Sequence, residues 1–274
     1  MKFRLLVIVI CVCLFMLPYL IYQKYVQAPT APDVVPELFQ NVPYIQMVAF
    51  EDTARMADAF KTADQPIYIS RFPDDFADKG TPDLFIQALL PYIQFYNQQI
   101  IAERQQFVAI ANKLWSGQPL TETEIQRFMQ LAELYDVQGD IDAGTAYHLL
   151  EKINFIPQTV ALSVALRETQ DGTKNLSSPF SVYVWNADNH YVRAAYPDLD
   201  RAYYAWMYQL NTADAHARFR ELRQRRLSAR SYPRAGYFLL KALQSLQPHV
   251  VYYENALSET YKKHNLVRFE DIDE

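Results

Sequence analysis

The chain has 274 residues, of which 50% are hydrophobic and 21% are charged, so it can bury the core of a good-sized domain and is not a disordered tail. Its formal net charge is -5, so the chain lacks the excess of basic residues that is typical of proteins that bind duplex nucleic acid. The chain also contains neither a GxGxxG nor a GxxxxGK(S/T) phosphate-binding loop. The sequence therefore argues against nucleic acid as a partner and against nucleotide-dependent chemistry.

Residues 1–22 are predicted to anchor the protein in a membrane. Two basic residues precede residues 5–22, which contain no charge and are near the lower length limit for a membrane-crossing helix. The positive-inside rule keeps the two cations in the cytoplasm and sends the rest of the chain across. A cleaved signal peptide is the alternative, but the run is long for one, and Ala28 and Ala31 are each followed by proline. We expect a single-pass inner-membrane protein with its C-terminal domain in the periplasm.

The next stretch, from residue 23, is predicted to be a semi-stiff spacer that holds a folded body off the membrane. Four prolines punctuate it, at Pro29, Pro32, Pro36 and Pro43.

The body that follows is predicted to be mainly helical. Thr81 and Pro82 supply an N-cap and an N1 proline, and apolar residues then recur at three- and four-residue intervals to Leu114, which is typical of one long amphipathic helix. The TETE sequence at 121–124 is a capping box that opens a second helix, and we expect Gly139 to close that helix.

The helical pattern continues with one β-like interruption. Residues 147–153 keep helical register, and Pro157 starts a helix through Glu168 that Gly172 breaks. Residues 180–196 alternate with a period of two around an Asn-Ala-Asp-Asn turn, which predicts a β-hairpin. Three further helices are expected, at 201–210 with Asp200 as the cap, at 236–246 and at 249–265.

The sequence offers little for metal or redox chemistry. Cys11 and Cys13 are the only cysteines and both lie in the first hydrophobic run, so the rest of the chain can form neither a disulfide nor a thiolate metal site. The histidines lack HExxH or paired i, i+4 spacing: His148, His190, His216, His249 and His264. No GxSxG nucleophile elbow is present. We expect no metal site and no organic cofactor.

Glu168 is the residue that we single out from its position alone. It ends a helix whose residues 160–166 are almost all apolar, and it stands just before the polar turn at 169–173. The negative end of a helix and low-dielectric surroundings both disfavour the ionised form of a carboxyl, as a general acid working near neutral pH requires. An ordinary solvated glutamate in the last turn is the other interpretation of the same position.

The segment around Glu168 also resembles a known family. Residues 155–173 read FIPQTVALSVALRETQDGT and are similar to IPxSLALAxAAxESGWGTS, the active-site helix of the Bax-like glucosaminidases, which are peptidoglycan N-acetylglucosaminidases of the lysozyme-like superfamily. The resemblance covers residues 66 to 266. It continues in PIYISRFP at 66–73, in LLPYI at 89–93 followed by Asn97, in YQLNT at 208–212, similar to HNLNT, and in FRELR at 219–223, similar to LRxxR.

The resemblance implies a mainly α (α+β) fold, a lysozyme-like helical domain at 66–266 with one β-hairpin. The single N-terminal transmembrane helix predicted from the hydrophobic run precedes this domain. The remaining divisions are the anchor 1–22, the linker and lead-in 23–65 and an acidic tail 267–274. It also implies that Glu168 is the general acid that protonates the leaving oxygen of a β-1,4 bond at N-acetylglucosamine in peptidoglycan. By analogy, the glycan-binding residues are Tyr183, Trp185, Tyr191, Trp206 and Asn211.

Glycoside hydrolysis also needs a second group, either a carboxylate that activates water or the acetamido group of the substrate. The candidate carboxylates are Asp171, Asp188, Asp198 and Asp200, and each of them also suits a turn or a cap. Asp171 leads these candidates because it follows Glu168 most closely. The sequence does not decide between a carboxylate and the substrate.

The chain departs from the family pattern at several positions near the expected site. Asp171 replaces a tryptophan, and the family's NxFG stretch becomes SPFS; the positions are Asp171, Ser178, Ser181, Ala213 and His216. Two functions therefore stay open, an active peptidoglycan hydrolase and a catalytically inactive peptidoglycan-binding or scaffold protein of the cell envelope on the same fold. The sequence identifies no protein partner.

A cluster of arginines follows the YQLNT motif: Arg218, Arg220, Arg223, Arg225, Arg226, Arg230 and Arg234. Such a cluster suits contact with anionic lipid headgroups or peptidoglycan carboxylates, and it equally suits a solvated helix face.

Overall fold

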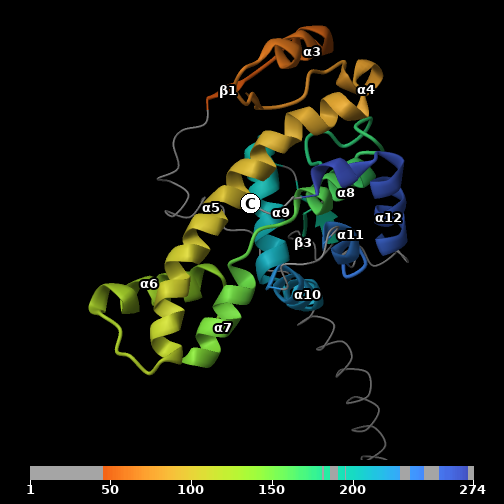
Figure 1. Cartoon of the computed structure of the whole chain (residues 1–274). Helices are drawn as coiled ribbons and strands as arrows, with labels where there is room; N and C mark the ends of the chain where they lie inside the picture. The colour runs from red at the N-terminus through yellow and green to blue at the C-terminus, as the bar shows by residue number, and fades with distance from the viewer. Residues whose placement is uncertain are drawn as a thin grey trace, which may run out of the picture.

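The computed structural model of the chain describes residues 46–180, 182–185, 191–194, 196–228, 235–243 and 253–270. The predicted anchor, the proline-punctuated stretch and residues 271–274 lie outside this set. Within it, no helix is both long and apolar enough to cross a membrane. The described part is mainly helical, as predicted, with two short pairs of strands (Figure 1).

In chain order the elements are β1 (Met47–Val48), α3 (Thr53–Thr62), β2 (Tyr68–Ile69), α4 (Phe76–Lys79), α5 (Pro82–Trp115), α6 (Glu122–Leu134), α7 (Ala143–Lys152), α8 (Gln158–Glu168), β3 (Tyr183–Trp185), β4 (Tyr191–Arg193), α9 (Leu199–Thr212), η1 (Asp214–His216), α10 (Ala217–Ser228), α11 (Ala235–Leu240), α12 (Tyr253–Lys263) and η2 (Leu266–Phe269).

The folded body begins before residue 66. β1 pairs in parallel with β2, and α3 connects the two strands. Asp75 accepts hydrogen bonds from the Thr53 backbone at 2.9 Å and from its hydroxyl at 2.7 Å, and Met56 of α3 is fully buried. Residues 47–65, which the sequence analysis placed in the linker and lead-in, are therefore folded against residues that follow them.

The long helix α5 is the spine of the molecule and was predicted from its first turn. The Thr81 hydroxyl accepts a hydrogen bond from the Leu84 backbone, and Pro82 stands at the first helical position, where its missing N–H costs nothing. With 34 residues, α5 is about 50 Å long. Figure 1 shows α3 and α4 at one end of this spine and α6 and α7 at the other.

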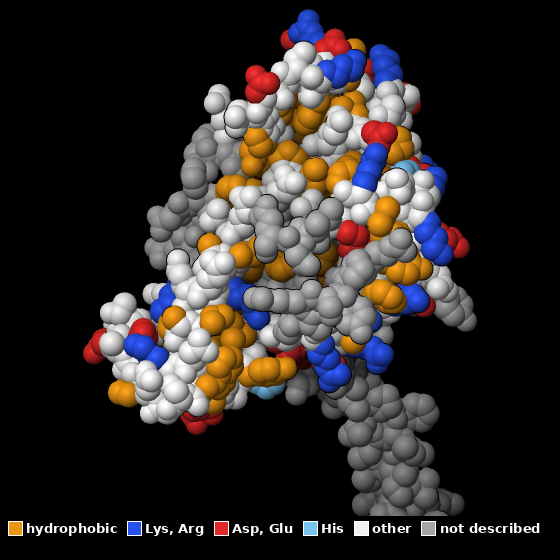
Figure 2. All heavy atoms as spheres, viewed as in Figure 1, with side chains coloured by type: hydrophobic (Ala, Val, Ile, Leu, Met, Phe, Trp, Pro, Cys, Tyr) orange, Lys and Arg blue, Asp and Glu red, His pale blue; other side chains and the backbone are white. Residues whose placement is uncertain are grey.

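Helices α6 and α7, with the end of α5, form a lobe that projects from the body (Figure 1). The capping box at Thr121 and Glu124 is present. The helix ends at Leu134 and not at Gly139, because Asp136 adopts a left-handed conformation (φ 50°). Helix α7 begins earlier than residue 147, because Asp142 caps it. Large hydrophobic side chains are exposed on this lobe (Figure 2): Trp115, Ile125, Met129, Ile141 and Tyr147.

Helix α8 lies at the centre of the domain. Every residue from Thr159 to Leu166 is buried, so the helix has no solvent-facing stripe, as expected for a helix surrounded by protein. It packs against α5, α11 and α12. Asn97 of α5 holds the segment before it in place: its side chain donates to the Ile156 carbonyl at 2.7 Å and accepts from the Ile156 N–H at 3.1 Å.

The predicted hairpin is present as β3 and β4, which pair antiparallel with Tyr183 opposite Arg193. The cap of the following helix differs from the prediction. Asp198 caps α9 by accepting from the Arg201 N–H, whereas the carboxyl of Asp200 accepts a 2.8 Å hydrogen bond from the Tyr96 hydroxyl. The correct cap is two residues earlier because Asp200 lies within the first turn of α9, where its side chain turns toward α5.

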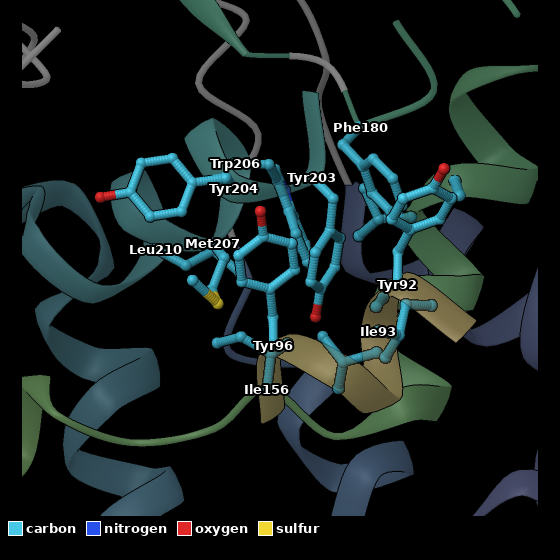
Figure 3. Packing of buried hydrophobic residues seen from close by; sticks show 14 of the residues in the cluster. Tyr92, Ile93, Tyr96, Ile156, Phe180, Tyr203, Tyr204, Trp206, Met207 and Leu210 are labelled. Atoms are coloured by element: carbon cyan, nitrogen blue, oxygen red, sulfur yellow. The ribbon is translucent and has the colours of Figure 1, made fainter. Parts of the chain in front are cut away.

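A cluster of aromatic rings from α5 and α9 fills the interior (Figure 3). Tyr96 lies 5.6 Å from Tyr203 between ring centroids, and Phe180 stacks on Trp206 at 5.3 Å. Because Phe180 immediately precedes the hairpin, this contact fixes the base of the hairpin on the core.

The last two predicted helices end earlier in the structure, α12 at Lys263. The helix predicted at 236–246 is α11, which ends at Leu240. The helix predicted at 249–265 is α12, and residues 244–252 before it lie outside the described part of the chain.

Candidate active site

The chain turns sharply just after Glu168. The Thr169 hydroxyl donates to the Ala165 carbonyl, and the next three residues all have positive φ: Gln170 (50°), Asp171 (62°) and Gly172 (84°). A Cβ on Gly172 would lie 3.1 Å from the Phe85 ring, so the residue with no side chain lets this turn press against α5. The helix was predicted to break at Gly172, but α8 ends at Glu168, because the left-handed backbone conformation already begins at Gln170.

The Glu168 carboxyl is contacted from two distant parts of the chain. The Tyr253 hydroxyl, at the first residue of α12, donates to Oε1 at 2.7 Å. The Arg193 guanidinium, on β4, places Nη2 3.8 Å from Oε2. The Glu168 side chain is 10% exposed. Both partners come from elements far from Glu168 in the sequence.

Arg193 is tied to the base of the hairpin. Its Nη2 donates to the Ser178 carbonyl at 2.6 Å, and the Ser178 hydroxyl donates to the Ala194 carbonyl at 3.0 Å. Its Nε is buried and has no hydrogen-bond partner among the described residues. Ser178, one of the departures from the family pattern, is therefore buried and helps to orient the cation beside Glu168.

Asp171, the leading candidate for the second carboxylate, binds the far end of α12. Its Oδ1 lies 2.7 Å from His264 Nε2, and its Oδ2 pairs with Lys263. Burial raises the pKa of Asp171, but the hydrogen bonds from Lys263 and His264 together outweigh burial and hold that pKa below its ordinary value. Glu168 and Asp171 thus hold opposite ends of the same helix.

Two of the other candidate carboxylates are hydrogen-bonded within the fold, and the third lies outside the described residues. Asp198 caps α9, and Asp200 is hydrogen-bonded to Tyr96. Burial raises the pKa of Asp200, although the Tyr96 hydrogen bond opposes this effect. Asp188 lies outside the described residues.

The predicted glycan-binding residues fall into two groups. Tyr183, Trp185 and Tyr191 belong to the hairpin strands, and their side chains lie outside what the structure describes. Trp206 is 5% exposed and stacks inside the core. Asn211 is 1% exposed, donates to the Asn154 carbonyl at 3.2 Å and accepts from Arg223 at 2.7 Å. In this structure the last two support the fold and present no surface to a ligand.

The arginine cluster is not one solvated helix face. Arg220 and Arg223 are buried and donate to backbone carbonyls, including those of Ala213 (2.6 Å) and Glu151 (3.0 Å). Arg218 and Arg225 are exposed, and Arg225 pairs with Glu221 on its own helix. The two arginines of the FRELR motif therefore hydrogen-bond to backbone carbonyls at helix ends and in loops within the fold. Arg230 and Arg234 lie outside the described residues.

The remaining departures lie at the end of α9 and are buried. Ala213 is 1% exposed and His216 is 4% exposed. Burial, followed by the neighbouring Arg220, lowers the pKa of His216 to about 3, so its imidazole is neutral at pH 7. Ser181 lies outside the described residues.

Glu103 is a buried carboxyl that the sequence analysis did not select. Burial raises its pKa to about 7, although Arg127 and Tyr135 both oppose that rise. Its Oε1 lies 2.7 Å from Arg127 Nη2, and its Oε2 accepts from the Tyr135 hydroxyl at 3.2 Å. A pKa near 7 suits a general acid. Glu103, however, lies in the middle of α5 with its carboxyl facing α6, so a bulky substrate has no access to it.

The described residues contain no group of three or more His, Cys, Asp and Glu side chains arranged to hold a metal ion. A cavity of about 10 Å³, room for about one water molecule, lies beside Tyr135, Tyr204 and Asn211. Glu168 does not line it.

No family model, no curated protein and no solved structure matches the chain.

Proposed function

We propose that this protein is a cell-wall glycan hydrolase that cleaves β-1,4 bonds at N-acetylglucosamine in peptidoglycan, with Glu168 as the general acid. The observation that carries the proposal is the setting of the Glu168 carboxyl. It ends a buried helix, is one-tenth exposed, and lies between the Tyr253 hydroxyl and Arg193 of the hairpin. The sequence resemblance to Bax-like glucosaminidases around the same residue supports this chemistry.

In the proposed reaction Glu168 gives a proton to the leaving glycosidic oxygen, and water takes the place of the leaving sugar at the anomeric carbon. Asp171, Asp198 and Asp200 are each held by other groups, so none is proposed to activate that water. The acetamido group of the substrate and Asp188 are the remaining candidates for the second group. The proposal includes a lysozyme-like domain, held in the periplasm by a membrane anchor at residues 5–22.

The test is the release of sugar chains by the full-length protein, purified in detergent, from isolated peptidoglycan. Mass spectrometry should find new reducing ends that carry N-acetylglucosamine. Glu168→Gln keeps the shape of the side chain and removes the transferable proton, so the rate should fall about a hundred- to ten-thousand-fold. The matched control is Glu103→Gln, which changes the other glutamate that has tyrosine and arginine partners.

Two results would contradict the proposal in different ways. If the wild-type protein releases no glycan over a broad pH range, the proposed hydrolase function is wrong. If that inactive protein still binds insoluble peptidoglycan, the result supports a catalytically inactive peptidoglycan-binding or scaffold protein of the cell envelope. An active Glu168→Gln variant would keep the hydrolase and remove Glu168 from its mechanism.

A further inference from the structure

Tyr253 links the C-terminal part of the chain to the Glu168 carboxyl. It lies 85 positions from Glu168 in the sequence and donates its hydroxyl to Oε1 at 2.7 Å. Its ring is 8% exposed and belongs to the buried core. The hydroxyl is therefore carried on a ring that packing already holds in place.

Helix α12, which begins with Tyr253, is fixed at several points. It packs along α8, and Lys263 and His264 at its far end bind Asp171. Between these ends, the Tyr261 hydroxyl donates to Glu270 at 2.9 Å. Because these contacts do not involve Glu168, we expect α12 to keep its position when the Tyr253 hydroxyl is removed.

A glutamate at a helix end needs such support. Its three side-chain torsions leave many rotamers open, and an unheld carboxyl samples several of them. Proton transfer requires the acid within about 2.6–3.2 Å of the reacting oxygen. A displacement of about 1 Å is enough to lower a rate about a hundredfold.

We propose that Tyr253 is a positioning residue for Glu168. The hydroxyl holds Oε1 and thereby turns Oε2 toward Arg193 and the hairpin, in the orientation from which the carboxyl meets its substrate. This role rests on the proposed function of Glu168, and Tyr253 itself need not touch the sugar.

The test removes one oxygen atom. Tyr253→Phe keeps the ring and its packing, and Tyr261→Phe is the matched control, since it removes a second buried hydroxyl of α12 that also binds a glutamate. With peptidoglycan as substrate, we expect kcat of Tyr253→Phe to fall about ten- to a hundredfold with KM nearly unchanged. We expect Tyr261→Phe to keep the wild-type kcat. Thermal unfolding of both variants checks that they fold.

Unchanged kcat in Tyr253→Phe, or an equal loss in both variants, would overturn the proposal. So would a loss confined to KM.

A second measurement does not depend on activity. In the full-length protein labelled with ¹³C at glutamate carboxyls, the Glu168 signal is the one lost in Glu168→Gln. We expect Tyr253→Phe to shift that signal and Tyr261→Phe to leave it in place. If the wild type proves inactive, this shift still supports the positioning contact while the proposed function fails. An unmoved Glu168 signal in Tyr253→Phe would overturn the positioning role itself.

Discussion

The lobe around Glu103 and the end of α8 around Glu168 bring the same three kinds of side chain together in different ways. In the lobe, Arg127 and Tyr135 belong to α6 or its C-cap, the helix that follows α5 in the chain. The arginine is in direct contact with the carboxyl, at 2.7 Å. Glu103 lies in mid-helix, and its side chain is 4% exposed. Its carboxyl is enclosed between two helices.

At the end of α8 the partners come from β4 and α12, and the arginine stands further away, at 3.8 Å. Glu168 is the last residue of its helix, so no following turn of α8 covers its carboxyl. A carboxyl, a phenol and a guanidinium in contact therefore do not by themselves define a reactive site. Under the proposed function, the position of the carboxyl along its helix separates Glu168, which meets the substrate, from Glu103, which joins two helices.

The largest expected effect separates the two glutamates by activity. Glu168→Gln should lower peptidoglycan hydrolysis about a hundred- to ten-thousand-fold and should shift the free energy of unfolding by less than about 1 kcal/mol. Glu103→Gln should keep the wild-type rate, because its carboxyl faces α6 and meets no substrate. Hydrolysis rates and denaturant unfolding of both variants test this prediction. A large loss of rate in Glu103→Gln would contradict the difference between the two glutamates.

The next effect concerns stability in the lobe. Arg127→Met leaves the Glu103 carboxyl buried without its cation, and we expect a loss of about 3 kcal/mol in the free energy of unfolding at pH 8. At pH 5 the loss should be smaller, because Glu103, with a pKa of about 7, is then protonated in the folded protein. Urea unfolding at both pH values checks this, and equal losses would contradict it.

Glu103 should also give the protein a pH-dependent stability near neutrality. Its pKa is raised from 4.5 to about 7 on folding, so its contribution is fully present below pH 4.5 and is lost as the pH rises through 7. We expect the wild type to lose on the order of 2 kcal/mol relative to Glu103→Gln between these values. Parallel curves of unfolding free energy against pH for the two proteins would exclude the effect.

The smallest effect concerns the contacts of Asp171 with the C-terminal end of α12. Asp171→Asn tolerates the left-handed backbone and removes the charge that pairs with Lys263 and His264, so we expect a loss of about 1 kcal/mol at pH 7. Because the pKa of Asp171 is lowered on folding, the loss should disappear as the pH falls below 3.8. Thermal unfolding at pH 7 and at acid pH measures it. Glu221→Gln, which removes an exposed pair with Arg225, is the control and should change little.

Local signals in the sequence determined much of the secondary structure. Thr81 with Pro82, and Thr121 with Glu124, predicted two helix starts that the structure confirms. These signals work because a cap satisfies backbone N–H groups only two or three residues away. The cap of α9 was predicted wrongly. The sequence predicted Asp200, but Asp198 caps the helix, while Asp200 lies within the first turn and its carboxyl accepts a hydrogen bond from Tyr96.

The sequence also selected Glu168, from its place at the end of an apolar helix and from the family resemblance. It did not reveal what surrounds the carboxyl. Tyr253 and Arg193 reach it only because α12 and the hairpin pack beside α8, and no local pattern encodes a contact across 85 positions. The same holds for Glu103, which looks like any polar residue of a long helix until α6 covers it.

Trp206 and Asn211 are two predicted glycan-binding residues that the fold buries. The family resemblance implied a ligand surface for both, but a ring or an amide serves a core as well as it serves a sugar. Tertiary packing buried them against Phe180 and Arg223. The starts of α5 and α6 follow from hydrogen bonds between neighbours in the chain, so the sequence alone predicted them. Burial and the pairing of distant charged groups depend on which surfaces meet, so only the tertiary structure decided them.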